Sequence, residues 1–119
     1  MQDFQKQKVW EKAHRLTLSA YQTTAQFPKS ELCDLARQLR RSAASIPANI
    51  AEGCGRRGRT EFAQFLQIAL GSASELQYHL ILARDLQLLG GPNQDRLSKE
   101  TVEIKRMLTA LIQKLRASD

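Results

Sequence analysis

Few side chains in this sequence are of the types that carry out catalysis. The two histidines, His14 and His79, stand far apart, and Glu75 lies one helical turn from His79. The paired Glu-x-x-His motifs of di-iron bundles are missing, as are Cys-x-x-Cys and any zinc-ligand spacing. Cys54 lies among arginines, which favour a thiolate, but also at a predicted helix C-terminus, which disfavours one. We therefore expect no catalytic residue, no metal and no cofactor, and we place His79 on the flank of a helix.

Arginine offers the more informative chemistry. Residues 37–59 contain six arginines, one acid and no lysine, and this segment supplies most of the net charge of +6. Guanidinium groups form paired hydrogen bonds to phosphate oxygens, and such contacts do not depend on base sequence. The segment predicts a nucleic-acid-binding surface, for RNA or structured DNA, formed by Arg37, Arg40, Arg41, Arg56, Arg57 and Arg59.

The same arginines also have a structural interpretation. Arginine stabilises helix C-termini through the helix dipole, and Arg56 follows Glu52 by four residues, the spacing of a helical ion pair. In this alternative the protein is an interaction scaffold whose arginines serve subunit or partner contacts. Trp10, Leu18 and Tyr21 support it, because they lie off the apolar stripe of the first predicted helix and would need a second partner. The patch of small residues near Gly71 supports it as well.

Length and composition favour one folded domain spanning residues 1–119. Hydrophobic residues make up 42% and charged residues 25%, which is typical of a soluble globular protein. The N-terminal residues have charges and no apolar core, unlike a signal peptide, and the longest aliphatic run, Leu80 to Ala83, is too short to span a bilayer. We expect a cytoplasmic protein that does not contact membranes.

Apolar spacing predicts four helices, over about residues 5–26, 30–53, 59–89 and from 93 onward. Phe27-Pro28, the glycines at 53 and 55, and Gly90-Gly91-Pro92 separate them, and Ser30 is the expected N-cap of the second helix. Long helices with short connections predict an all-α fold, an antiparallel up-down-up-down four-helix bundle.

Pro47 falls inside the second predicted helix. The apolar stripe continues in phase across it, so we expect one helix kinked at Pro47. Asn49 is placed to bond either the carbonyl that Pro47 leaves free or a neighbouring helix, and Glu52 to hold the arginines. Gly71, in the middle of the third helix, predicts a close approach by a neighbouring backbone.

Several of these segments together resemble a known family. They are Gln38-Leu39-Arg40-Arg41, Ser45-Ile46-Pro47-Ala48-Asn49-Ile50-Ala51-Glu52-Gly53, and the spaced residues Glu61-Phe62, Phe65-Leu66, Ile68-Ala69, Gly71-Ser72 and Glu75-Leu76. The sequence is similar to the four helix bundle protein family, also called the 23S ribosomal RNA intervening-sequence protein family. This family is related to the accessory variability protein of diversity-generating retroelements. The resemblance runs from Val9 to Leu89, and the fourth helix matches only by pattern. Gly58 departs from it, since the family usually has serine there, and only the cap of the third helix is weakened.

The resemblance implies a homopentamer, a barrel of bundles around a central channel. The related accessory variability protein of diversity-generating retroelements is associated with nucleic acid and with a reverse transcriptase. The expected function is therefore a non-catalytic accessory protein whose partners are itself, RNA or DNA, and a reverse transcriptase or other protein. Within the signature, structural roles are expected for Ser45, Pro47, Asn49, Glu52, Gly53 and Gly71.

Overall fold

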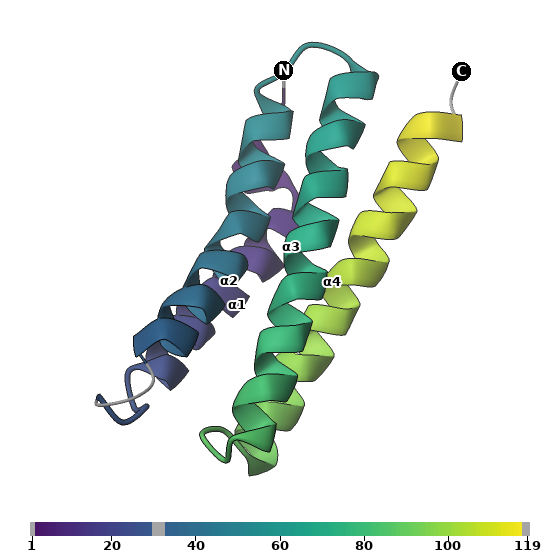
Figure 1. The fold of residues 1–119 in the computed structure, drawn as a ribbon. Helices are drawn as coiled ribbons and strands as arrows, with labels where there is room; N and C mark the ends of the chain where they lie inside the picture. Colours follow the sequence, from purple (N-terminus) through teal and green to yellow (C-terminus); the bar gives the residue numbers. More distant parts are fainter. Residues whose placement is uncertain (1, 30–32, 118–119) are drawn as a thin grey trace.

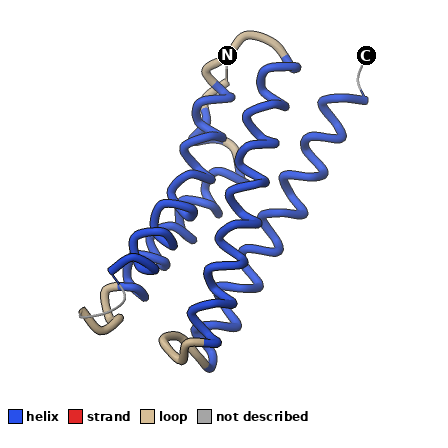
Figure 2. Tube along the Cα trace, in the orientation of Figure 1, coloured by secondary structure: helices blue, strands red, loops and turns tan. Residues whose placement is uncertain are grey.

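Four long helices make up most of the chain. The computed structural model describes residues 2–29 and 33–117. A short 3₁₀ helix, η1 (Phe4–Lys6), precedes α1 (Lys8–Thr24), α2 (Cys33–Cys54), α3 (Arg59–Asp85) and α4 (Gly91–Ala117). Within those ranges there is no strand, and successive helices run in opposite directions (Figures 1 and 2). The predicted all-α, antiparallel up-down-up-down bundle is confirmed.

The helices form an elongated bundle of 50 × 20 × 19 Å. Each helix packs on the helices before and after it, and α4 completes the bundle by packing on α1. Every helix buries one stripe of apolar side chains, as amphipathic helices do. The largest fully buried apolar side chains are Leu16, Leu39, Ile46, Ile50, Leu66, Leu76, Leu80, Leu97, Ile104 and Leu108.

Several helix ends differ from the prediction. The first helix was expected over residues 5–26, but α1 spans only Lys8–Thr24. The third helix was expected to reach Leu89, but α3 ends at Asp85 because Gln87 adopts a left-handed backbone with φ 63°. The N–H of Leu88 then bonds the Ala83 carbonyl at 2.9 Å, which is the Schellman arrangement of a helix C-terminus. At the other end of this connection, α4 begins at Gly91, earlier than residue 93. The expected N-cap Ser30 lies outside the described residues.

Pro47 leaves α2 unbroken, so the predicted continuity of this helix is confirmed, and the kink at Pro47 stays a prediction. Proline has no N–H for the carbonyl four residues earlier, that of Ala43. The hydroxyl of Thr17 in α1 lies 3.1 Å from this carbonyl and 2.8 Å from the Ala13 carbonyl of its own helix, so its one proton is shared between the two acceptors. Asn49, for which this carbonyl was one of two expected partners, donates instead to the carbonyl of Ser45 in its own helix at 2.8 Å. A neighbouring helix therefore supplies the donor that α2 lacks.

The close approach expected at Gly71 occurs at Gly53. A Cβ at Gly71 would meet no atom within 4 Å, because this glycine lies on the outer side of α3. A Cβ at Gly53 would lie 2.9 Å from Cδ1 of Phe62 and 2.9 Å from Cβ of Phe65. Gly53 thus lets the C-terminus of α2 pack closely on α3, and the prediction for Gly71 is wrong within this chain.

Candidate nucleic-acid interface

The six arginines lie in two groups at opposite ends of α2. Arg37, Arg40 and Arg41 are near its start, and Arg56 follows its last residue, Cys54. Sixteen residues separate Arg40 from Arg56, which at 1.5 Å per residue is about 24 Å along the helix axis. Figure 1 shows the start of α2 beside the end of α1, at the opposite end of the bundle from the α2–α3 connection. The structure therefore does not bring the six together into one surface.

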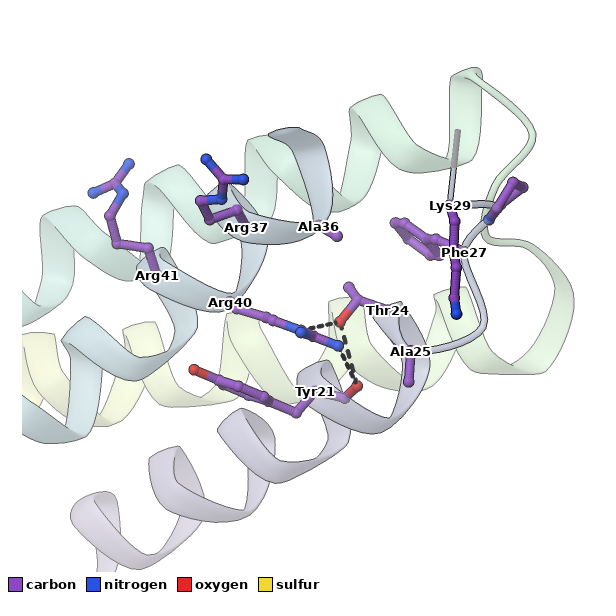
Figure 3. A pocket seen from close by; sticks show the side chains of 10 residues that line it. Tyr21, Thr24, Ala25, Phe27, Lys29, Ala36, Arg37, Arg40 and Arg41 are labelled. Carbon is purple, nitrogen blue, oxygen red and sulfur yellow. Dashed lines mark hydrogen bonds between the residues drawn. The ribbon is translucent and has the colours of Figure 1, made fainter. Parts of the chain in front are cut away.

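The first group lines a hollow between the end of α1 and the start of α2. We call it the Arg40 hollow; its volume is about 780 Å³. Arginines from α2 form one side of it, and aromatic and small side chains from α1 and the following loop form the other (Figure 3). The lining residues are Tyr21, Thr24, Ala25, Phe27, Pro28, Lys29, Ala36, Arg37, Arg40 and Arg41.

Arg40 is held in place at the centre of this hollow. Its Nε donates to the Thr24 hydroxyl at 2.7 Å, and its Nη2 donates to the Tyr21 carbonyl at 3.3 Å. The guanidinium carbon lies 4.8 Å from the centroid of the Tyr21 ring, in cation–π contact. Because these partners belong to the last turn of α1, Arg40 also stabilises the negative end of that helix, as the structural interpretation of the arginines requires.

Arg37 and Arg41 are more exposed. Arg37 is 77% exposed and lies 4.0 Å from the Asp34 carboxylate. Arg41 is 63% exposed and donates to Glu75 of α3 at 3.0 Å. Exposed ion pairs contribute only about 0–1 kcal/mol, so a phosphate can replace either carboxylate at small cost. These two guanidinium groups are therefore available to an anionic ligand.

The second group, which we call the Arg56 end, consists of Arg56, Arg57 and Arg59. Arg56 pairs with Glu52 at 3.4 Å, which confirms the expected helical ion pair, and its guanidinium covers the Phe65 ring at 4.9 Å. Arg56 and Arg59 line a hollow of about 130 Å³, and Arg57 is exposed in the loop outside it. This hollow is much smaller than the Arg40 hollow.

Cys54 borders the same small hollow and is buried. Burial raises the pKa of its thiol, and Asp3 adds to the rise. A thiol with a raised pKa is protonated and a poor nucleophile at neutral pH. The structural interpretation of Cys54 is therefore the one that its surroundings support.

His79 is buried in the α2–α3 contact, 5% exposed, and is not on a helix flank as expected. Its Nδ1 lies 3.1 Å from the hydroxyl of Ser42, which itself bonds the Leu39 carbonyl. Because the Ser42 hydroxyl donates its proton to the Leu39 carbonyl, the Nδ1–H of His79 is the donor to the Ser42 oxygen. Burial lowers the pKa of His79, with Glu75 opposing the shift and Arg41 adding to it. The neutral pair therefore joins two helices, and the fully buried hydroxyl of Ser42 is closed to a substrate.

A second polar contact between α2 and α3 involves the family signature. The Ser45 and Ser72 hydroxyls are 2.8 Å apart, and the Asn49 amide donates to the Ser45 hydroxyl at 3.0 Å. The structural roles expected for Ser45 and Asn49 agree with these contacts. Among the described residues there is no group of His, Cys, Asp or Glu side chains that could hold a metal ion. Nor does any helix within residues 2–29 and 33–117 have the length and apolar character of a membrane span.

One exposed apolar surface was not foreseen. Ile68, Tyr78 and Ile81 are exposed on α3, and we call this surface, with Gly71 between them, the α3 face. Apolar residues occur on both sides of α3, and only those of the inner stripe, which face the core, were interpreted from the sequence. The spacing from Ile68 to Gly71 and on to Tyr78, three and then seven residues, is the signal that would have found it.

Comparison with known proteins agrees with the signature. The family model described as 23S rRNA-intervening sequence protein matches residues 5–110. The chain is also similar to the crystal structure of a protein of unknown function from the S23 ribosomal protein family of Bacteroides thetaiotaomicron VPI-5482. That similarity covers 88% of this chain and 98% of the other, with 25% sequence identity and a TM-score of 0.80. No curated protein shows significant similarity to the chain.

Proposed function

The chain belongs to the 23S rRNA-intervening sequence protein family, and from this premise we propose that it is an accessory protein that binds RNA or structured DNA through the Arg40 hollow. It has no catalytic role of its own in this proposal, and it acts as a homo-oligomer in the cytoplasm. The pentamer implied by the family resemblance is the form that we propose.

The observation that carries this proposal is the Arg40 hollow itself. Three arginines from α2 line one hollow, and two of them, whose guanidinium groups point away from Tyr21 in Figure 3, pair with exposed carboxylates. The third, Arg40, is already oriented by Thr24 and by the backbone of Tyr21, so it loses little freedom when an anion binds. Preorganised guanidinium groups suit phosphate oxygens better than lysine ammonium groups do.

Binding to labelled RNA across a salt series tests the proposal. Each phosphate contact contributes about −0.7 to the slope of log affinity against log salt for a single strand. The double variant Arg37→Gln/Arg41→Gln should therefore bind more weakly, with a slope smaller in magnitude by about 1.4. Arg40 is left unchanged in this test, because its loss would also remove hydrogen bonds that stabilise α1.

The matched control is Arg15→Gln/Arg106→Gln, which removes the same charge from exposed positions on α1 and α4. The control should retain the slope of the unmodified protein. If both double variants change the slope equally, only net charge matters and the Arg40 hollow is not the site. If the protein binds RNA without salt dependence, the proposal is wrong.

The α3 face favours a second function, a protein-interaction scaffold. Tyr78 is 59% exposed and Ile68 is 51% exposed, and the small Gly71 between them allows a second helix to approach. The occupant that we propose is another copy of this chain, in keeping with the homo-oligomer. Light scattering on Tyr78→Glu tests this, with Arg15→Gln/Arg106→Gln as control. The variant should lose the oligomer and retain its helical content, and an unchanged mass would exclude the α3 face as the subunit contact.

A further inference from the structure

We propose that the Arg40 hollow binds an unpaired nucleotide, whose base stacks on the Tyr21–Arg40 pair while Arg37 and Arg41 hold adjoining phosphates. The protein would then prefer single-stranded to double-stranded nucleic acid. This inference rests on the proposed nucleic-acid binding and adds to it the kind of strand that is bound.

Tyr21 and Arg40 form a fixed pair in the hollow. The Tyr21 ring is 45% exposed, and the Arg40 guanidinium lies over it at 4.8 Å from the ring centroid (Figure 3). The two hydrogen bonds of Arg40, to Thr24 and to the Tyr21 carbonyl, fix the position of the guanidinium. Unpaired bases stack on tyrosine rings and on guanidinium planes, and this stacking tolerates any base. The pair therefore offers a base-binding surface that a purely electrostatic site would not need.

Cations lie beside this surface. Arg37 and Arg41 both line the hollow and are four residues apart, so they lie on the same side of α2 one turn from each other. Their carboxylate partners are exposed and exchange easily with phosphate. A volume of about 780 Å³ falls within the range of pockets that enclose a small ligand, about 300–1,000 Å³. One nucleotide with its flanking phosphates matches this combination of ring, cations and size.

A duplex matches it less well. Paired bases are stacked on one another inside a duplex, so they cannot reach Tyr21 without being flipped out, which costs a few kcal/mol. A duplex lying along α2 would next meet Ala44, Ser45 and Ala48, which carry no charge, before reaching the Arg56 end about 24 Å away. The cations are thus concentrated around the ring and do not follow α2 as a continuous track.

The test measures the affinity of the full chain for a labelled single-stranded oligouridine, for an RNA duplex of equal length, and for an abasic strand. The variants are Tyr21→Leu, which removes the ring, and Tyr21→Phe, which retains it. Leu86→Ala is the control, since it removes an exposed apolar side chain that belongs neither to the Arg40 hollow nor to the α3 face. The backbone carbonyl and Thr24 still hold Arg40 in every variant, and circular dichroism verifies that each variant is folded.

We expect the unmodified protein to bind the single strand more tightly than the duplex. Tyr21→Leu should weaken single-strand binding about tenfold, within the range for loss of one stacked base, with an unchanged salt slope. Tyr21→Phe and Leu86→Ala should leave it unchanged, and the abasic strand should bind all four proteins equally. A 2-aminopurine base in the strand should lose fluorescence on binding, as stacked bases do.

Failure of this inference is distinguishable from failure of the proposed function. If binding is salt-dependent but Tyr21→Leu leaves single-strand affinity unchanged, or the duplex binds as tightly, the base-stacking inference is wrong and phosphate binding stands. The same holds if the 2-aminopurine fluorescence does not change. If none of the three probes binds in a salt-dependent manner, both proposals are wrong.

Discussion

Replacing Thr17 by valine should destabilise the bundle through a carbonyl in a different helix. Valine has the shape of threonine but no hydroxyl, so packing is retained. In α2 the carbonyl of Ala43 has no N–H partner at residue 47, because that residue is proline, and the Thr17 hydroxyl lies 3.1 Å from it. Ala43 is fully buried, so water does not replace the lost donor.

A buried carbonyl left without a donor costs about 1–3 kcal/mol. We expect Thr17→Val to lower the free energy of unfolding by about 1.5 kcal/mol, in the middle of this range. For a chain of this size such a loss lowers the melting temperature by about 6 °C. In a Pro47→Ala background, residue 47 regains an N–H that can bond Ala43. The same Thr17→Val substitution should then cost about 1 kcal/mol less.

Urea unfolding of the four proteins of this cycle, at one protein concentration, measures the coupling between the two positions. Thr101→Val is the control, since the buried Thr101 hydroxyl makes the same bond within its own helix, at 2.7 Å to Leu97, that Thr17 makes to Ala13 at 2.8 Å, and the Leu97 carbonyl retains its helical N–H partner. Thr101→Val should cost clearly less than Thr17→Val. An equal cost of Thr17→Val in both backgrounds, or an equal cost of the two threonine substitutions, would refute this explanation of how α2 continues through Pro47.

Three further predictions concern stability. Gly53→Ala should lower the free energy of unfolding in urea by about 1–3 kcal/mol through overpacking, because the new Cβ would lie 2.9 Å from Phe62 and Phe65; a neutral effect would show that the two helices separate freely. Gly71→Ala should raise the stability of the single chain by about 0.5–1 kcal/mol, since its Cβ would meet nothing; a loss measured in the dissociated chain would contradict this. Because burial lowers the pKa of His79, the unfolded chain takes up a proton near its ordinary value of 6.5 while the folded chain resists it. Stability should therefore fall as the pH drops below about 6.5, and His79→Gln should flatten this profile in urea titrations at several pH values; parallel profiles would count against it.

The sequence was sufficient to place the helices where glycine or proline marks their ends. Pro28, Gly53 and the run from Gly90 to Pro92 carry that signal, and all four helices occur where they were expected. The predicted end of α3 was four residues too late, because Gln87 takes the left-handed conformation that glycine usually adopts at a helix C-terminus. Glutamine does not favour this conformation, so the residue type does not predict it. The apolar pattern also continues past Asp85 to Leu89, and this pattern predicts a helix that ends later than α3 does.

The candidate site was predicted in residue type but not in arrangement. Helical spacing shows that Arg37, Arg40 and Arg41 share one side of α2, and the helical rise alone separates them from Arg56. What spacing does not show is which helix lies opposite. The contacts of Arg40 with Tyr21 depend on how α1 packs on α2. In the sequence, Tyr21 is recognisable only as a residue that lies outside the apolar stripe of the first helix. Tertiary packing turned that residue into part of the hollow.

The central claim is that nucleic acid lies in the Arg40 hollow, and photo-crosslinking tests it most directly. A single-stranded RNA containing 4-thiouridine is bound to the full chain and irradiated, and the crosslinked peptide is identified by mass spectrometry. We expect the crosslink in the last turn of α1, at or next to Tyr21, and we expect high salt to abolish it. Crosslinks confined to the α3 face or to the Arg56 end, with none at the Arg40 hollow, would contradict the claim.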